Sequence, residues 1–490
     1  MAHRALLCFA IIGLLVVSPG AGAKGPEPLA QTIATLVRRA GLGDGLGIHV
    51  VRLHDAQELY RNRPERPRNP ASNQKLLTAA AALRRLGPAF RAATKVEGTI
   101  KNGRVTQLVV RASGDPSLGY AGLDALAEAL HLRGVDSVDR ILIDDTYFDD
   151  QILPPAFEQQ PKESAAFRAA ISAFAVNRNS YVVHLGPGAE LEGPGRVRVL
   201  ADGYVQIDNR TVTIAGGPPT PRIEDKLTED GHLAVRVDGA IPKQVRTLYY
   251  RRRVPDPKTY AALLLVRALK KAGLGGALAV EYGPVTEQQP VLVDMPSSQL
   301  SSLLYPVGKW SDNFTAEMLL KILGAQLERP GTSANGTVVV REELMKMGVD
   351  TEGLVMVNGS GLFDGLSRYH HLIQTFHRAW TGHNDDLFTT DNMTIDCNFC
   401  IVRLKVSAGQ LEGTHDGHHP IDAIHSIQRT AIQLALIANK ADYGHLFPSG
   451  QMCFKSLFLD AGHNRLNIRF TCTHFHNDNH FLSFQYYQIF

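Results

Sequence analysis

The chain has 490 residues, with 51 basic and 48 acidic side chains and a net charge of +3. Because nucleic-acid binding needs a concentrated basic surface, this near balance gives no support for a nucleic-acid partner. Hydrophobic residues make up 44% of the chain and charged residues 20%, which excludes a mostly disordered or fibrous protein. Five Cys are too few for a disulfide scaffold of this length, and no internal apolar run reaches the roughly 18 residues that a membrane span needs.

The first 23 residues have the three-part plan of a secretory signal peptide. Arg4 is followed by the apolar run Ala5–Val17 and then by Ser18–Ala23, which ends in small residues. We expect cleavage after Ala23 and export of the mature chain to the periplasm, either soluble or associated with the membrane but without a transmembrane span. The alternative for this segment is a short buried helix.

Helix and strand patterns follow the leader. Apolar residues at helical spacing predict a helix over Glu27–Ala40. Two β-like runs joined by a polar turn predict strands at Leu46–Leu53 and Glu58–Arg61. The Ala- and Leu-rich run after Lys75 predicts a strong helix that is apolar on most faces and therefore buried, ending at Gly87.

From about residue 90 to residue 282, short β-like runs alternate with Pro and Gly clusters, which indicates one or two β-rich domains. These runs are Gln107–Arg111, Arg140–Ile143, Tyr181–Leu185, Arg196–Leu200, Thr211–Ile214 and His232–Val237. Helical patterns follow at Thr259–Ala272, Leu300–Gly324 and Gly336–Met347.

The composition changes after about Asp364. The last 126 residues hold 13 of the 19 His and four of the five Cys, but only two of the 26 Pro. Segment 365–490 is therefore either a metal-binding module or a non-native continuation that follows a frameshift or a fusion, and we favour the second interpretation. Cys397-x-x-Cys400 is half of a zinc site, and Cys453 and Cys472 stand at spacings too irregular to complete it. The His residues that could bind a metal are His415, His418, His419, His474, His476 and His480. We expect no metal site.

The first candidate catalytic pair is Ser72-x-x-Lys75, at the start of the predicted buried helix. Positions i and i+3 of a helix share a face, so the Lys amine can reach the Ser hydroxyl. A Ser hydroxyl becomes an effective nucleophile when a base removes its proton, and a desolvated Lys can be that base. Taken alone the motif is weak, because a Ser helix cap beside a Lys that extends to solvent uses the same residues.

The second candidate is Ser311-Asp312-Asn313. A second hydroxyl beside Lys75 can relay the proton to a leaving amine, and the Asn313 amide can bind a substrate carbonyl and hold the Lys. The tripeptide alone is also compatible with a simple helix cap. Together the two motifs are part of the acyl-serine signature of β-lactamases and penicillin-binding proteins, whose third element is Lys-Thr-Gly.

Longer stretches around these motifs resemble the D-alanyl-D-alanine carboxypeptidase/endopeptidase family, the class C low-molecular-mass penicillin-binding proteins. The stretches are Pro70–Leu77, Gly114–Leu118, Asp144–Phe148, Lys309–Leu320 and Asn358–Leu362. The resemblance covers about residues 26–364. It implies an α+β fold with a penicillin-binding/serine β-lactamase-like transpeptidase domain, an antiparallel sheet flanked by helices, built from residues 24–90 and 285–364. Residues 91–284 would be the inserted β-rich domain or domains.

By this resemblance Ser72 is the acylated nucleophile, Lys75 is its base, and Ser311 and Asn313 complete the proton relay and the substrate contacts. The substrates would be peptidoglycan stem peptides. Cleavage of the D-Ala-D-Ala bond is carboxypeptidase activity, and cleavage of the cross-link between D-Ala and a diamino acid is endopeptidase activity. β-Lactams would acylate the same Ser as covalent inhibitors, and the reaction needs no metal or cofactor.

The chain departs from the family because Lys-Thr-Gly occurs nowhere in it. The nearest string is Lys455-Ser456-Leu457, in which Leu replaces the Gly. In the family, the strand that carries Lys-Thr-Gly supplies a backbone donor to the oxyanion hole. Losing one such donor lowers the reaction rate by a factor of about 10²–10³.

If residues 365–490 are foreign, the catalytic sheet is left open with an unpaired edge. We therefore expect a chain that is inactive or badly folded as written. The alternatives are a non-catalytic peptidoglycan-binding relative and a serine β-lactamase, although the 235 residues between Lys75 and Ser311 argue against the latter. No substrate-binding residue is assigned beyond the two motifs.

Overall fold

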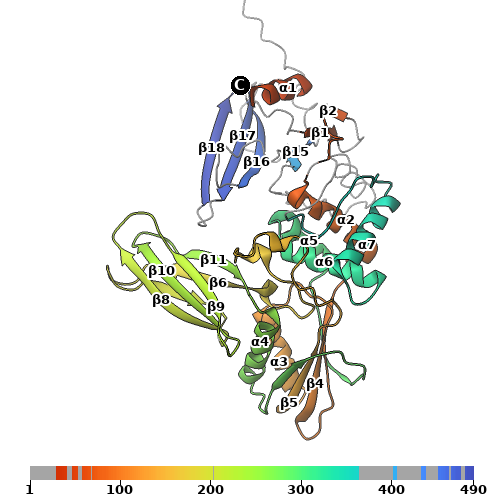
Figure 1. The fold of residues 1–490 in the computed structure, drawn as a ribbon, viewed down its shortest axis with the longest axis vertical. Coiled ribbons are helices and arrows are strands. Elements are labelled where there is room, and N and C mark those ends of the chain that lie inside the picture. Colours follow the sequence, from red (N-terminus) through yellow and green to blue (C-terminus); the bar gives the residue numbers. More distant parts are fainter. Residues whose placement is uncertain are drawn as a thin grey trace, which may run out of the picture. The chain divides into compact units, whose positions relative to one another are not determined.

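A computed structural model describes residues 29–40, 47–52, 58–67, 69–201 and 203–362, together with five strands in the C-terminal segment. The predicted signal peptide lies outside the described residues. The chain divides after Asp44 into two compact units. The first contributes helix α1 (Leu29–Ala40), which confirms the predicted helix, and the second contains all the other described elements (Figure 1).

Four helices of the second unit pack together in one group. They are α2 (Gln74–Leu86), α5 (Leu300–Lys309), α6 (Asn313–Leu327) and α7 (Ser333–Lys346). Helix α6 contacts each of the other three, and every residue from Asn313 to Ala325 is buried. A helix that is apolar on nearly all faces is expected to be enclosed in this way. No helix among the described residues is long and apolar enough to span a bilayer.

The prediction of one continuous helix over Leu300–Gly324 is wrong at Trp310–Asp312. Helix α5 ends at Lys309, and the chain starts again as α6 at Asn313. Ser311 has a φ of 55°, a left-handed conformation that a residue with a Cβ adopts rarely. The break places the Ser-Asp-Asn tripeptide at the N-terminal end of a buried helix instead of in the middle of one.

Between α2 and α5 the chain builds a mixed five-stranded sheet in the order β12-β5-β4-β3-β13. Its strands are β3 (Ala93–Glu97), β4 (Arg104–Ala112), β5 (Ser137–Asp144), β12 (Ala279–Tyr282) and β13 (Val291–Pro296). Strands β4 and β5 are parallel, so the chain needs a crossover between them. Helix α3 (Tyr120–Leu132) provides that crossover and packs against α4 (Pro257–Lys271). The sequence analysis predicted α4 but not α3.

Two three-stranded sheets, in the orders β8-β10-β9 and β11-β6-β7, complete the strands of residues 91–284, which we call the inserted region after the sequence prediction. Their strands are β6 (Ser180–Gly186), β7 (Arg196–Val199), β8 (Val205–Ile214), β9 (Arg222–Leu227), β10 (Leu233–Pro242) and β11 (Leu248–Arg253). The six strand runs predicted between residues 90 and 282 all fall in strands of these three sheets, to within one residue at their ends. The β-rich texture is thus confirmed, and the fold is α+β.

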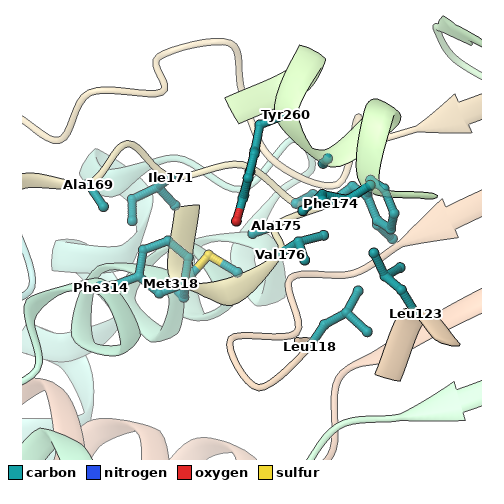
Figure 2. Packing of buried hydrophobic residues seen from close by; sticks show 14 of the residues in the cluster. Leu118, Leu123, Ala169, Ile171, Phe174, Ala175, Val176, Tyr260, Phe314 and Met318 are labelled. Atoms are coloured by element: carbon teal, nitrogen blue, oxygen red, sulfur yellow. The ribbon is translucent and has the colours of Figure 1, made fainter. Parts of the chain in front are cut away.

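One apolar core joins the inserted region to the helices. Residues of the segment Ala169–Val176 belong to the same buried cluster as Phe314 and Met318 of α6, Leu123 of α3 and Tyr260 of α4 (Figure 2). Because interiors are close-packed, such a shared core resists movement of one part against the other. The inserted region is therefore packed onto the helix that begins with the Ser-Asp-Asn tripeptide.

The predicted strands near the N-terminus are confirmed as β1 (Gly47–Arg52) and β2 (Glu58–Asn62). They belong to a sheet in the order β14-β15-β1-β2, in which β14 is Ile401–Leu404 and β15 is Ile432–Ile437. Strand β1 pairs antiparallel with β2 on one side and with β15 on the other. The expectation of an unpaired edge is therefore wrong for β1, because the C-terminal segment supplies a backbone partner for it.

The remaining described strands form an antiparallel sheet of their own, in the order β16-β17-β18. They are β16 (Gln451–Gly462), β17 (Arg465–Phe475) and β18 (Phe481–Ile489).

The close approach of α7 to α6 generates a stability prediction. A Cβ on Gly336 of α7 would collide with the Leu320 backbone of α6. We expect Gly336→Ala to lower the free energy of unfolding by about 1–3 kcal/mol, because overpacking at a backbone contact outweighs the gain in helix propensity. Urea denaturation measures this change. The control is Val338→Ala on the exposed side of α7, which should stay within about 0.5 kcal/mol of the wild type. Equal stability of both variants would contradict the close packing.

Candidate active site

The structure places Ser72 and Lys75 in contact. Ser72 is half-buried in a short 3₁₀ turn, Ala71–Asn73, directly before α2. Lys75 lies in the first turn of α2. Lys75 is only 2% exposed, and its Nζ donates a hydrogen bond to Ser72 Oγ at 3.0 Å. The i, i+3 spacing therefore brings the two groups together as predicted. Burial removes the amine from water, which is the condition under which a Lys can act as a base.

A loop far along the sequence closes over the start of α2. This site loop is Asn358–Gly361, and its carbonyl oxygens accept hydrogen bonds from α2 side chains. Asn358 accepts from Gln74 Nε2, Gly359 from Thr78 Oγ1 at 2.8 Å and Ser360 from Lys75 Nζ at 2.9 Å. Gly361 has a φ of 73°, and a Cβ there would collide with the Ala71 carbonyl. Only glycine fits so close an approach at that dihedral angle without strain.

Glu317 of α6 holds the opposite side of the site loop. The residue is 1% exposed, and its carboxylate accepts backbone hydrogen bonds from Gly359 N at 2.8 Å and from Ser360 N at 2.7 Å. Burial raises the pKa of the Glu317 carboxyl, while the hydrogen bonds from the site loop and the positive charge of Lys75 oppose that rise. The sequence analysis did not single out Glu317. Its only signal was a Glu inside a strongly apolar helix.

The tripeptide Ser311-Asp312-Asn313 is anchored at the start of α6, and α6 packs against α2. The Asp312 carboxylate accepts from Thr315 Oγ1 at 2.5 Å and lies 3.6 Å from Arg178 Nε. Asn313 Nδ2 donates to the Phe167 carbonyl at 2.9 Å, so part of its hydrogen-bonding capacity serves the inserted region. Asn313 precedes Glu317 by four residues, about 6 Å along the helix axis. The two predicted motifs therefore lie on neighbouring helices that share the site loop.

A second buried charge on α6 anchors the segment that follows Asp144–Phe148. Lys321 is 1% exposed, and its Nζ donates to Asp149 Oδ1 and, at 2.8 Å, to the Gln151 carbonyl. The ammonium also lies 5.7 Å from the centroid of the Phe148 ring, within the range of a cation–π contact. Glu317 and Lys321 thus tie two separate segments to successive turns of one helix.

The C-terminal segment contributes strands to the sheet of β1, but it contains no Lys-Thr-Gly sequence. The string Lys455–Leu457 lies in β16, which pairs with β17 and belongs to a different sheet from β1. Cys397, Cys400 and five of the six His considered as metal ligands lie outside the described residues. Cys453, Cys472 and His474 lie in strands whose backbone alone is described.

A buried Lys bonded to a Ser at the start of a helix, with a second Ser-x-Asn element on the adjacent helix, is the arrangement of the penicillin-binding serine peptidases as a class. The D-Ala-D-Ala carboxypeptidase 3 (S13) family matches residues 29–371, and the chain belongs to that family.

Two curated relatives are similar to somewhat less than two thirds of the chain. A D-alanyl-D-alanine carboxypeptidase of Actinomadura sp. (strain R39) is 35% identical over 332 residues, which is 65% of this chain and 61% of the relative. The D-alanyl-D-alanine carboxypeptidase DacB of Haemophilus influenzae is 26% identical over 304 residues, which is 60% of this chain and 62% of the relative. The chain therefore spans about three fifths of the length of these relatives.

The fold is similar to a solved structure as well. Penicillin-binding protein 4 (dacB) from Haemophilus influenzae matches with a TM-score of 0.62 and 20% sequence identity, over 90% of both chains. At that identity the likeness concerns the fold, and it agrees with the α+β transpeptidase-like architecture with extra domains that the sequence predicts.

The buried Glu317 carboxyl generates a prediction about pH. Because burial raises its pKa in the folded state, the folded protein binds this proton more tightly than the unfolded chain does. The stabilisation from Glu317 is therefore greatest below the ordinary Glu pKa of about 4.3 and is lost as the pH rises through the folded pKa. We expect the unfolding free energy of the wild type minus that of Glu317→Gln to fall with rising pH in a urea titration series. A difference that rises with pH would contradict the raised pKa.

Proposed function

We propose that this chain is a serine-type D-Ala-D-Ala carboxypeptidase/endopeptidase by descent, with peptidoglycan stem peptides as substrates and an acyl-Ser72 intermediate. We further propose that its turnover is impaired because the Lys-Thr-Gly motif is missing. The observation that carries the proposal is the 3.0 Å hydrogen bond from the buried Lys75 amine to Ser72 Oγ, in a chain of the S13 family. The names of the curated relatives support the substrate class.

In the proposed acylation step, Ser72 Oγ attacks the carbonyl carbon of the penultimate D-Ala while Lys75 Nζ takes the hydroxyl proton. The bond to the terminal D-Ala nitrogen breaks, and that amine leaves with a proton delivered from Lys75 through the Ser311 hydroxyl. Asn313 binds a substrate carbonyl. The peptide remains attached to Ser72 as an ester.

In the deacylation step, water attacks the ester carbonyl carbon and the bond to Ser72 Oγ breaks. A proton of that water returns to Ser72 Oγ, and the peptide leaves with a new terminal carboxyl group. With a terminal D-Ala as leaving group the net reaction is carboxypeptidase cleavage, and with a cross-linked diamino acid it is endopeptidase cleavage. A β-lactam enters the same first step, but its ring opens without releasing a fragment that can diffuse away. β-Lactams are therefore expected to be covalent inhibitors at Ser72.

The missing Lys-Thr-Gly motif affects the stabilisation of the tetrahedral intermediate. A tetrahedral intermediate carries a negative oxygen, which preorganised backbone donors stabilise. In the family one donor comes from the Lys-Thr-Gly strand, and this chain contains no such sequence. The Ser72 and Lys75 pair can generate a nucleophile without it, but the intermediate is less stabilised. Slow acylation is the expected consequence.

The proposed location is the periplasm, reached by export through a signal peptide at residues 1–23. Peptidoglycan lies outside the cytoplasm, so the proposed substrates require export. The signal peptide is proposed from its apolar run and small-residue end alone.

The first test is labelling of residues 24–490 with a fluorescent penicillin, beside Ser72→Ala. We expect the wild type to be labelled and the variant not, because the ester forms on Ser72 Oγ. We also expect the second-order labelling rate to be about 10²–10³-fold below that of the Actinomadura relative, because one oxyanion donor is missing. Stopped labelling reactions resolved on a gel measure both rates.

Each outcome separates a different alternative. Labelling that persists in Ser72→Ala would contradict the assignment of the nucleophile. Labelling as fast as that of the relative would contradict the impairment. A folded wild type that is never labelled would favour a non-catalytic peptidoglycan-binding relative. Rapid hydrolysis of a chromogenic cephalosporin would favour a serine β-lactamase.

A further inference from the structure

The site loop Asn358–Gly361 lies between two helices that bind it through opposite backbone groups. Side chains of α2 donate to its carbonyl oxygens, whereas Glu317 of α6 accepts from its amides. The two sequence motifs give proposed roles to residues at the starts of α2 and α6. They assign no role to Glu317, although its carboxylate is among the most enclosed charged groups of the described chain.

Ser360 connects Glu317 with Lys75. Its N–H donates to Glu317 Oε1 at 2.7 Å, and its carbonyl oxygen accepts from Lys75 Nζ at 2.9 Å. The same Lys75 Nζ also donates a hydrogen bond to Ser72 Oγ. A displacement of the Ser360 backbone therefore moves one of the groups that hold the amine beside the proposed nucleophile.

The site loop has little room to find another position. A Cβ on Gly359 would lie 2.6 Å from the Ala316 carbonyl oxygen of α6, and Gly361 is pressed against the Ala71 carbonyl on the other side. Contacts below 3.0 Å with backbone atoms leave no space for a side chain. The loop is thus confined between α6 and the turn that carries Ser72, and Glu317 holds it from the α6 side.

The chemistry of the carboxylate suits this task. Both oxygens act as acceptors, one for each amide, and hydrogen bonds to a charged acceptor are about twice as strong as neutral ones. A Gln of the same shape keeps one acceptor but turns an NH₂ donor toward a backbone N–H. An Asp keeps the charge and both acceptors but draws them back by one methylene.

We propose that Glu317 is a positioning residue for Lys75. By holding the amides of Gly359 and Ser360 it fixes the Ser360 carbonyl, and that carbonyl holds the Lys75 amine against Ser72 Oγ. The inference rests on the proposed function only in that Lys75 is taken as the base of Ser72. The geometry of the support does not depend on which substrate is cleaved.

A matched control is provided by Glu343 of α7. It is also a buried carboxylate, 3% exposed, and it also holds α2, but through Arg84 Nε at 3.0 Å. Arg84 is nine residues beyond Lys75, about 13 Å along the helix axis. A Glu343→Gln change therefore removes a buried charge that supports α2 without touching the site loop.

The test compares Glu317→Gln with Glu343→Gln in residues 24–490. Penicillin acylation is resolved into the binding constant and the first-order acylation rate. We expect Glu317→Gln to slow the acylation step about 10²-fold with unchanged binding, because misplacement of the base by about 1 Å costs that much. Glu343→Gln should leave both constants unchanged. Circular dichroism and melting temperature establish that each variant is folded.

Glu317→Asp keeps the proposal testable if the Gln variant does not fold. It should acylate more slowly than the wild type and faster than any folded Glu317→Gln. Wild-type acylation rates in both Glu317 variants, or an equal loss in Glu343→Gln, would overturn the proposal and leave Glu317 as a general stabilising residue.

A separate readout covers a wild type that penicillin does not acylate, which would be a failure of the proposed function and not of this inference. The mobility of the Lys75 Cε methylene is then measured by ¹³C relaxation, and hydrogen exchange is measured at Gly359 and Ser360. We expect Glu317→Gln, but not Glu343→Gln, to raise the Lys75 mobility and to reduce protection of both amides at least about tenfold, the equivalent of one lost hydrogen bond. Unchanged mobility of Lys75 would overturn the inference.

Discussion

Buried charge on α6 is the constraint on which the rest of the site depends. Glu317 and Lys321 lie one turn apart in a helix that is otherwise mostly apolar. Removing an ion from water costs several kcal/mol unless nearby groups replace the lost hydration. Each side chain therefore requires a fixed partner, which is the site loop for Glu317 and the segment Asp149–Gln151 for Lys321. Two segments that are far apart in the sequence are held in place by adjacent turns of one helix.

Helix α2 is held near both of its ends, and the interactions near its start are the ones that preorganise the Ser72 and Lys75 pair. Near its start, Lys75 and two neighbouring side chains bind the carbonyls of the site loop. Near its end, Arg84 and Arg85 pair with the buried Glu343 of α7. A side chain is well placed for chemistry when surrounding groups lock its rotamer, and the interactions around Lys75 provide that support. Ser72, in contrast, is only half-buried.

Local rules explain which parts of this arrangement could be predicted from the sequence. The contact of Ser72 with Lys75 follows from i, i+3 geometry, and most strands and helices follow from periodicity. The break at Ser311 was missed, because Ser adopts a left-handed backbone rarely and its residue type does not mark one. The role of Glu317 was missed for a similar reason, since its partners lie more than 40 residues away. An unpaired edge of the catalytic sheet was expected because the composition of residues 365–490 indicated a foreign segment. Backbone pairing does not depend on such a composition, and β15 pairs with β1.

The end of the family match separates the residues proposed to activate the nucleophile from the region expected to stabilise the oxyanion. The match ends at residue 371, just after the site loop and close to the change in composition after Asp364. The groups that we propose to prepare the Ser72 nucleophile lie before this boundary: the buried Lys75, the Ser-Asp-Asn tripeptide and the carboxylate of Glu317. The strand that would stabilise the developing oxyanion lies after it in the family, and here that region pairs with β1 without carrying the motif. Nucleophile activation and oxyanion stabilisation are separate contributions to the rate. A chain can therefore keep the first intact by packing alone while lacking the second.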